Sequence, residues 1–235
     1  RWTTHLLNMP IYYEMKEKSD DSAIATAYNA KTIDFKYSEN FKNIFDLYVN
    51  NSTTEKGLLS GKSVENSMAE FALGKAAMVQ NGNWAWDQIS KVSGNTVKAD
   101  DIKYLPIYIG VDGEEKQGLC IGTENYLAIN KNVSEEKQKA SVDFLEWLFS
   151  SDTGKDYVVP FNTFEDNEKP DDPLARQVIS WMEKDKTTVE WVFNSFPSLD
   201  FKDDVGNALL EYVQGSKSWD NVKSTTIESW KNAKS

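Results

Sequence analysis

The sequence predicts an α/β fold, because amphipathic helix patterns alternate along the chain with short apolar runs of strand length. The 235 residues are 40% hydrophobic, which is enough apolar material for one large core or two modest ones. No internal repeat and no low-complexity tract interrupts the alternation. We therefore expect a globular protein and not a disordered chain.

The first half of the chain supplies two helices and one strand. Residues 39–48 carry apolar side chains at helical spacing, which predicts a helix with one buried face. Residues 64–72 show the same pattern, and Gly74 ends that helix. The apolar run 76–79 has the length of a strand, and Asn81-Gly82 then turns the chain.

The middle of the chain predicts three further strands. Residues 102–109 and 116–121 are strand-like runs on either side of Asp112-Gly113, which is a turn signal. Residues 126–130 form the third run. Cys120 lies in the second run, and as the single cysteine it is expected to be a small buried hydrophobic side chain and not a reactive thiol.

The remainder of the chain is predicted to be helical. Ser134 caps a helix with an apolar stripe that includes Phe144 and Leu148, and a second helix follows from 152 to about 159. After a loop over 162–172, helices are expected from Pro173 to Met182, over 201–214 and over 219–233. Three tryptophans fall in these helix patterns and are expected in cores: Trp147, Trp181 and Trp230.

Charge excludes some classes of partner. The chain has 26 basic and 37 acidic residues, a formal net charge of -11, which repels nucleic acid phosphates and anionic lipid surfaces. No apolar run approaches the length of a bilayer span. One histidine and one cysteine cannot form a nitrogen and sulfur zinc site.

The turn after residues 76–79 is the most informative local feature. Open α/β sheets place ligands where a strand ends in a loop at the start of a helix. Trp84 lies at this point and offers a flat, partly polar face, so we expect a flat, polar ligand there. Trp86 enters the next helix and is expected to be structural.

Several motifs resemble one family in the same order along the chain. They are Glu70-Phe71, Gly74-Lys75-Ala76-Ala77-Met78, Gly82-Asn83-Trp84-Ala85-Trp86 and the glycine-bearing segment 118–130. This pattern is similar to that of extracellular solute-binding proteins (family 1) of carbohydrate ABC importers, the group that includes maltodextrin-binding proteins. The helix pair over 137–157 also agrees with that group.

The resemblance implies a type II periplasmic-binding-protein-like fold of two lobes. Residues 1–118 and 166–235 would form the C-terminal lobe, and 119–165 part of the N-terminal lobe, so most of the N-terminal lobe is expected to be missing from this chain. Extra residues are also expected near Val159-Pro160. The family further implies an extracellular location, lipid-anchored or periplasmic, with a signal that this chain does not contain.

By the same resemblance Trp84 stacks on a sugar ring. A pyranose has an apolar C–H face and a rim of hydroxyls, so its site needs an aromatic plane with hydrogen-bonding side chains around it. The expected contacts, in decreasing order of support, are Trp84, Asn83, Arg1, Trp2, the segment Thr123-Glu124-Asn125 and, as a loose match, Phe196.

The expected function is therefore capture of a mono- or oligosaccharide and its delivery to a membrane permease. We expect a monomer that needs no cofactor or metal, binds no nucleic acid and performs no catalysis. Calcium binding on scattered carboxylates stays open. Two alternatives stay open: a non-carbohydrate solute such as a peptide, polyamine or anion, and a glycoside hydrolase. The second is disfavoured because nothing in the spacing of Asp87, Glu124 and Asp200 selects a catalytic pair.

Overall fold

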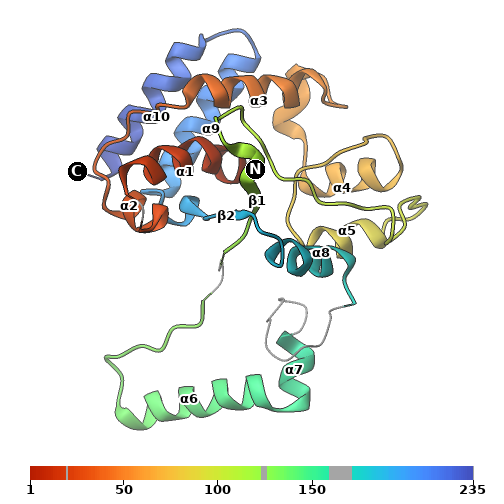
Figure 1. The fold of residues 1–235 in the computed structure, drawn as a ribbon, viewed down its shortest axis with the longest axis vertical. Coiled ribbons are helices and arrows are strands. Elements are labelled where there is room, and N and C mark those ends of the chain that lie inside the picture. Colours follow the sequence, from red (N-terminus) through yellow and green to blue (C-terminus); the bar gives the residue numbers. More distant parts are fainter. Residues whose placement is uncertain (20, 123–125, 159–170, 235) are drawn as a thin grey trace.

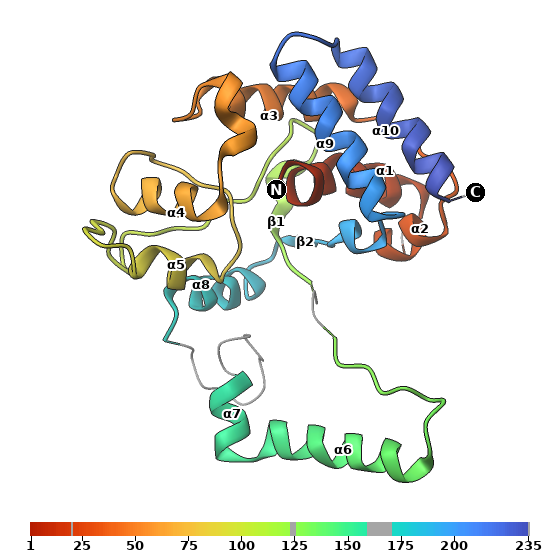
Figure 2. The ribbon, with the colours of Figure 1, turned by 180° about the vertical axis from the view of Figure 1, so that it is seen from behind.

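The computed structural model describes residues 1–19, 21–122, 126–158 and 171–234. The described part has a mainly helical body and an arm that extends from it (Figures 1 and 2). Two hydrophobic cores lie in the body, a large one and a small one. No helix in these ranges is both long and apolar enough to span a bilayer.

The large core is built from both ends of the chain. A π-helical turn, Trp2–Leu6, runs into α1 (Leu7–Lys18), and α2 (Ala23–Asn29) and α3 (Ser38–Asn50) follow. The C-terminal helices α9 (Leu199–Val213) and α10 (Trp219–Ala233) pack against each other and against these N-terminal elements (Figure 2). The predicted helix over 39–48 is confirmed within α3. The helices α1 and α2 were not predicted.

The small core lies beside the large one. It is formed by α4 (Val64–Ala72), α5 (Ala85–Ser90), α8 (Pro173–Met182) and the extended segment that begins near residue 102. Together they bury six side chains: Met68, Ala72, Ala85, Ile89, Ile102 and Leu174. A 3-10 helix, Lys56–Gly61, connects α3 to α4. The predicted helix over 64–72 is confirmed, and Gly74 follows it with a φ of 70°.

The sheet is much smaller than predicted. In the described part, β1 (Gln117–Cys120) pairs in parallel with β2 (Thr187–Val189). The predicted strand over 116–121 is confirmed as β1, with the short 3-10 helix Glu114–Lys116 before it. A second 3-10 helix, Val192–Ser195, follows β2.

The strands predicted over 76–79, 102–109 and 126–130 are wrong, because these segments do not pair into a sheet among the described residues. In residues 102–109, side chains make backbone hydrogen bonds that a neighbouring strand would otherwise make. The Tyr104 N–H donates to Gln177 Oε1 at 2.9 Å, the Ile109 N–H donates to Glu114 at 2.7 Å, and Gln117 Nε2 donates to the Ile107 carbonyl at 3.1 Å. Side chains therefore satisfy backbone groups that a sheet would otherwise pair.

The arm consists of α6 (Glu135–Ser150) and α7 (Asp152–Val158), which lie apart from the body in both views (Figures 1 and 2). Both helices were predicted, and the Ser134 hydroxyl accepts the Lys137 N–H as a cap. The predicted apolar stripe is largely exposed: Leu148 is buried, but Phe144 is 54% exposed. Trp147 is 48% exposed, so its predicted place in a core is wrong.

The predicted C-terminal helices are confirmed with their caps. Asp172 caps α8, Gly215 ends α9 with a φ of 76°, and Ser218 forms a capping box with Asn221 at the start of α10. Trp230 is fully buried as predicted, and Trp181 is partly buried beside Lys184. The predicted loop over 162–172 lies mostly outside the described residues. The lobe boundaries stay a prediction.

Candidate ligand-binding site

A cavity of about 3130 Å³ opens between the two cores. It is lined by the first residues of the chain, the end of α3, the helix α4, the loop before α5, the extended segment 101–108 and β1. Residues of the arm, such as Leu148 and Tyr157, border it as well. Small-molecule pockets usually measure roughly 300–1,000 Å³, so this space is an open cleft.

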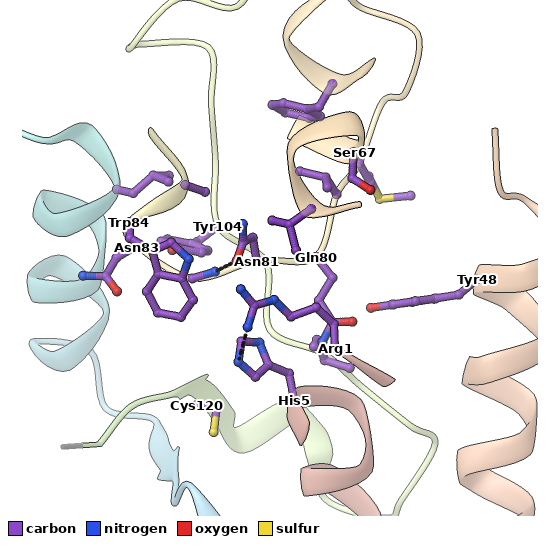
Figure 3. A pocket seen from close by; sticks show the side chains of 18 of the residues that line it. Arg1, His5, Tyr48, Ser67, Gln80, Asn81, Asn83, Trp84, Tyr104 and Cys120 are labelled. Atoms are coloured by element: carbon purple, nitrogen blue, oxygen red, sulfur yellow. Dashed lines mark hydrogen bonds between the residues drawn. The ribbon is translucent and has the colours of Figure 1, made fainter. Parts of the chain in front are cut away.

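Trp84 projects into this cleft from the loop that leads into α5 (Figure 3). The Asn81 Oδ1 accepts the Gly82 N–H at 2.9 Å, and the Ala85 N–H donates to the Gly82 carbonyl at 3.0 Å. The turn therefore falls at Asn83-Trp84, two residues later than predicted. Ala85 and Ile89 anchor α5 in the small core, while the Trp84 side chain stays 37% exposed.

Gly82 lies directly against the Trp84 ring. A Cβ atom at position 82 would lie 2.2 Å from Trp84 Cζ3, which no real contact permits. We therefore expect Gly82→Ala to displace the indole and to weaken any ligand that depends on it by about tenfold or more, or roughly 1.4 kcal/mol. Titration calorimetry of the variant measures this loss.

The matched control is Gly57→Ala, because a Cβ atom there meets no other atom within 4 Å. It should bind ligand as the unaltered protein does. Equal affinities of the two variants would show that the position of the Trp84 ring does not depend on Gly82.

Arg1 and His5 face Trp84 across the cleft. The Arg1 guanidinium carbon lies 5.4 Å from the centroid of the Trp84 ring, and Arg1 Nη1 lies 3.4 Å from His5 Nε2 (Figure 3). Since a guanidinium can only donate, His5 Nε2 accepts, which assigns the imidazole proton to Nδ1. Arg1 is thus positioned by an aromatic ring and by a neutral acceptor.

His5 is enclosed by aromatic rings. The ring centroids of Trp191, Phe193 and Trp84 lie 4.9, 5.9 and 6.0 Å from that of His5, which is only 4% exposed. Burial, and after it the positive charge of Arg1, lowers the pKa of His5 from 6.5 to about 4. His5 is therefore neutral at neutral pH.

The lowered pKa of His5 makes the stability of the folded protein depend on pH. Below pH 6.5 the unfolded chain binds a proton at His5 that the folded protein accepts only near pH 4. The free energy of unfolding is therefore highest above pH 6.5. It falls by about 3 kcal/mol in total as the pH falls to 4. His5 is the single histidine, so the proton NMR titration of its imidazole measures the pKa directly. A value near 6.5 would contradict the burial of this ring.

The structure brings together four of the predicted contacts. Arg1, Trp2, Asn83 and Trp84 all line the cleft, although the Trp2 ring also packs edge-on against Phe45, with centroids 4.9 Å apart. Thr123, Glu124 and Asn125 lie outside the described residues.

Phe196 does not line the cleft. Its ring packs against those of Phe201 and Trp230 in the large core, with centroids 5.4 and 5.7 Å away. We therefore omit it from the contacts proposed below. The segment of Phe196 resembles the family's ligand-contacting segment only loosely, and that resemblance could not show whether the Phe196 ring lies in a core or faces a ligand.

Several lining residues were not predicted from the sequence. They are Tyr48, Ser67, Gln80, Asn81, Tyr104 and Trp191, which come from five separate segments. Gln80 and Asn81 could have been included, because they immediately precede the turn that carries Trp84. Gln80 Nε2 is buried and, among the described residues, has no hydrogen-bond partner.

The described side chains of the cleft are better suited to hydrogen bonding and aromatic stacking than to acid, nucleophilic or metal-assisted catalysis. Glu70 lines it, but hydrogen bonds from Lys62 and Thr53 lower the pKa of this carboxyl, so it stays ionised. Burial raises the pKa of the Cys120 thiol, which makes it a poor nucleophile. The described residues contain no group of three or more histidine, cysteine or acidic side chains that could hold a metal.

One family model matches the chain. The model of bacterial extracellular solute-binding proteins covers residues 15–164, which include α4, the Trp84 turn and α5. No curated protein and no solved structure matches the chain.

Proposed function

Because the chain belongs to the bacterial extracellular solute-binding proteins, we propose that it captures a mono- or oligosaccharide for an ABC importer, with Trp84 as the stacking platform. Such a protein is the substrate-capture subunit and delivers its ligand to a membrane permease. The observation that carries the carbohydrate assignment is the exposed Trp84 indole, which projects into a cleft lined by hydrogen-bonding side chains (Figure 3).

The chemistry of a sugar fits this arrangement. The C–H face of a pyranose packs on an aromatic plane, while its hydroxyls need neighbours that donate and accept. Amide and hydroxyl side chains of this kind line the same cleft: Tyr48, Ser67, Gln80, Asn81 and Asn83. A purely apolar ligand would leave these groups unpaired, which costs binding free energy.

The two cores explain how capture can involve closure. Trp84 is carried by α5 of the small core, whereas Trp2 and His5 belong to the π-helical turn that packs into the large core. A ligand on Trp84 would thus touch elements anchored in both cores. A ligand that contacts both sides binds a closed state better than an open one and shifts the protein toward closure.

A monomeric state and either lipid anchoring to the cell membrane or a periplasmic location belong to the same proposal. The second candidate is a non-carbohydrate anion, such as a peptide with a free carboxylate. Arg1 favours it, because its guanidinium lies in the cleft over Trp84.

The test is titration calorimetry with neutral and acidic saccharides, acidic dipeptides and polyamines, combined with tryptophan fluorescence. We expect saturable binding of at least one saccharide, with a change in fluorescence as the ring is covered. Binding of peptides or polyamines without any binding of saccharides would reject the carbohydrate assignment.

A further inference from the structure

We propose that the saccharide carries a carboxylate, as uronic acids do, and that Arg1 binds this carboxylate while the sugar ring lies on Trp84. This inference rests on the proposed function and names the ligand class more closely. Three features of the described part of the cleft support it: an arginine with no acidic partner there, a basic lining in an acidic protein and a buried donor with no acceptor among the described residues.

Arg1 is the first feature. Among the described residues, no carboxylate forms an ion pair with it. Its side-chain contacts are the Trp84 ring and the neutral His5, and neither removes its charge. A guanidinium has a planar fork of N–H donors that matches the two oxygens of a carboxylate. Arg1 therefore has free capacity for an anionic group within the cleft.

The choice of residue type points the same way. Only two of the 26 basic residues in the chain are arginines, Arg1 and Arg176, and all the others are lysines. Lysine provides a point charge, whereas arginine provides bidentate geometry and stacks on aromatic rings. One of these two arginines lies over the aromatic ring proposed to hold the ligand.

The lining of the cleft is the second feature. Among the described residues, five basic and three acidic side chains line it, although the whole chain has a net charge of -11. One acidic side chain, Glu70, is paired with one basic side chain, Lys62, which leaves four basic and two acidic side chains in the lining. The described lining thus has an excess of positive charge, and with it a positive local potential, in a chain whose net charge is negative. A potential of this sign attracts anionic ligands and disfavours polyamines.

Gln80 is the third feature. The Gln80 side chain lines the same cleft, and its buried Nε2 has no acceptor among the described residues. Buried donors are nearly always paired in folded proteins, so an unpaired one beside a cleft indicates an acceptor that comes with the ligand. A carboxylate or a hydroxyl oxygen provides such an acceptor.

The shape of a uronic acid suits these positions. Its carboxylate lies on the rim of the pyranose, so the C–H face remains free to pack on an indole. One ligand can therefore engage Trp84 with its ring and Arg1 with its acid group at the same time. A neutral sugar would leave the guanidinium without an anionic partner.

The test compares matched pairs by calorimetry: glucuronate with glucose, galacturonate with galactose, and the corresponding disaccharides. We expect the acidic member of the best-binding pair to bind at least about tenfold more tightly, as a charge-assisted bidentate contact provides. Arg1→Gln should abolish this preference, and Arg1→Lys should keep only part of it. Arg176→Gln is the matched control and should keep the full preference.

The possible outcomes are distinct. If neutral sugars bind as tightly as acidic ones, or if Arg1→Gln weakens both equally, the inference is overturned while the proposed function stands. If acidic dipeptides bind and no saccharide does, both are overturned. Circular dichroism of Arg1→Gln must match that of the unaltered protein, and a folded variant that keeps the acid preference also overturns the inference.

Discussion

Replacing Trp84 by alanine is expected to weaken saccharide binding by about 30-fold or more. Tryptophans at the centre of a binding site commonly contribute roughly 2 kcal/mol or more, which corresponds to this factor. Because the Trp84 side chain is 37% exposed and lies outside both cores, the melting temperature should change little. Titration calorimetry and a thermal melt of the same sample separate the two effects.

The control for this substitution is Trp147→Ala. Trp147 is similarly exposed, at 48%, but it lies on α6 of the arm and does not line the cleft. Its loss should leave affinity unchanged. A similar loss of affinity in both variants, or none in Trp84→Ala, would contradict the role of the Trp84 ring.

Trp230→Ala should give the largest loss of stability. The Trp230 side chain is fully buried and packs edge-to-face on Phe201 and Phe196, with centroids 5.4 and 5.7 Å away. Its indole N–H also donates to the Ala30 carbonyl at 3.0 Å and ties α10 to the end of α2. Removing a buried tryptophan costs about 3–5 kcal/mol, a large part of a typical unfolding free energy. Urea unfolding measures this loss.

Trp230→Phe separates packing from hydrogen bonding at this position. It keeps an aromatic ring but removes the donor to Ala30, so we expect a smaller loss than in the alanine variant. If Trp230→Ala lowered the unfolding free energy by less than about 1 kcal/mol, the packing around α10 would not be as the structure has it.

The helices were the most predictable part of the fold, because their signals are local. Ser134, Asp172 and Ser218 each precede a helix in the sequence, and each caps one in the structure. A cap and the apolar spacing that follows it lie within one short segment. The helix α1 lacks such a clear stripe, because it is buried around most of its circumference. The helix α2 has only 7 residues, too few to show one.

The strands were less predictable because a strand depends on a partner elsewhere in the chain. Residues 76–79 and 102–109 have the apolar composition of strands, yet they do not pair into a sheet among the described residues. Side chains from α8 and from the region of β1 bind the backbone of 102–109 instead. Composition indicates that a segment is extended, but it does not identify the neighbour.

In the candidate site, too, a local feature could be predicted from the sequence, whereas contacts between distant segments could not. Trp84 was selected from its own turn, and the structure places it in the cleft, although the strand over 76–79 that was part of that argument does not pair into a sheet among the described residues. The assembly of Arg1, His5 and Trp191 could not be predicted, because Trp191 follows β2 and lies far from the first two in the sequence. Folding alone brings these residues together and places in the cleft a guanidinium that forms no ion pair among the described residues.

A crystal structure of the protein with its tightest-binding saccharide would examine the central claim most directly. We predict that the C–H face of one pyranose lies parallel to the Trp84 indole, at van der Waals distance, with its hydroxyls bonded to side chains of the cleft. A saccharide bound at another place, with the indole still uncovered, would contradict the account.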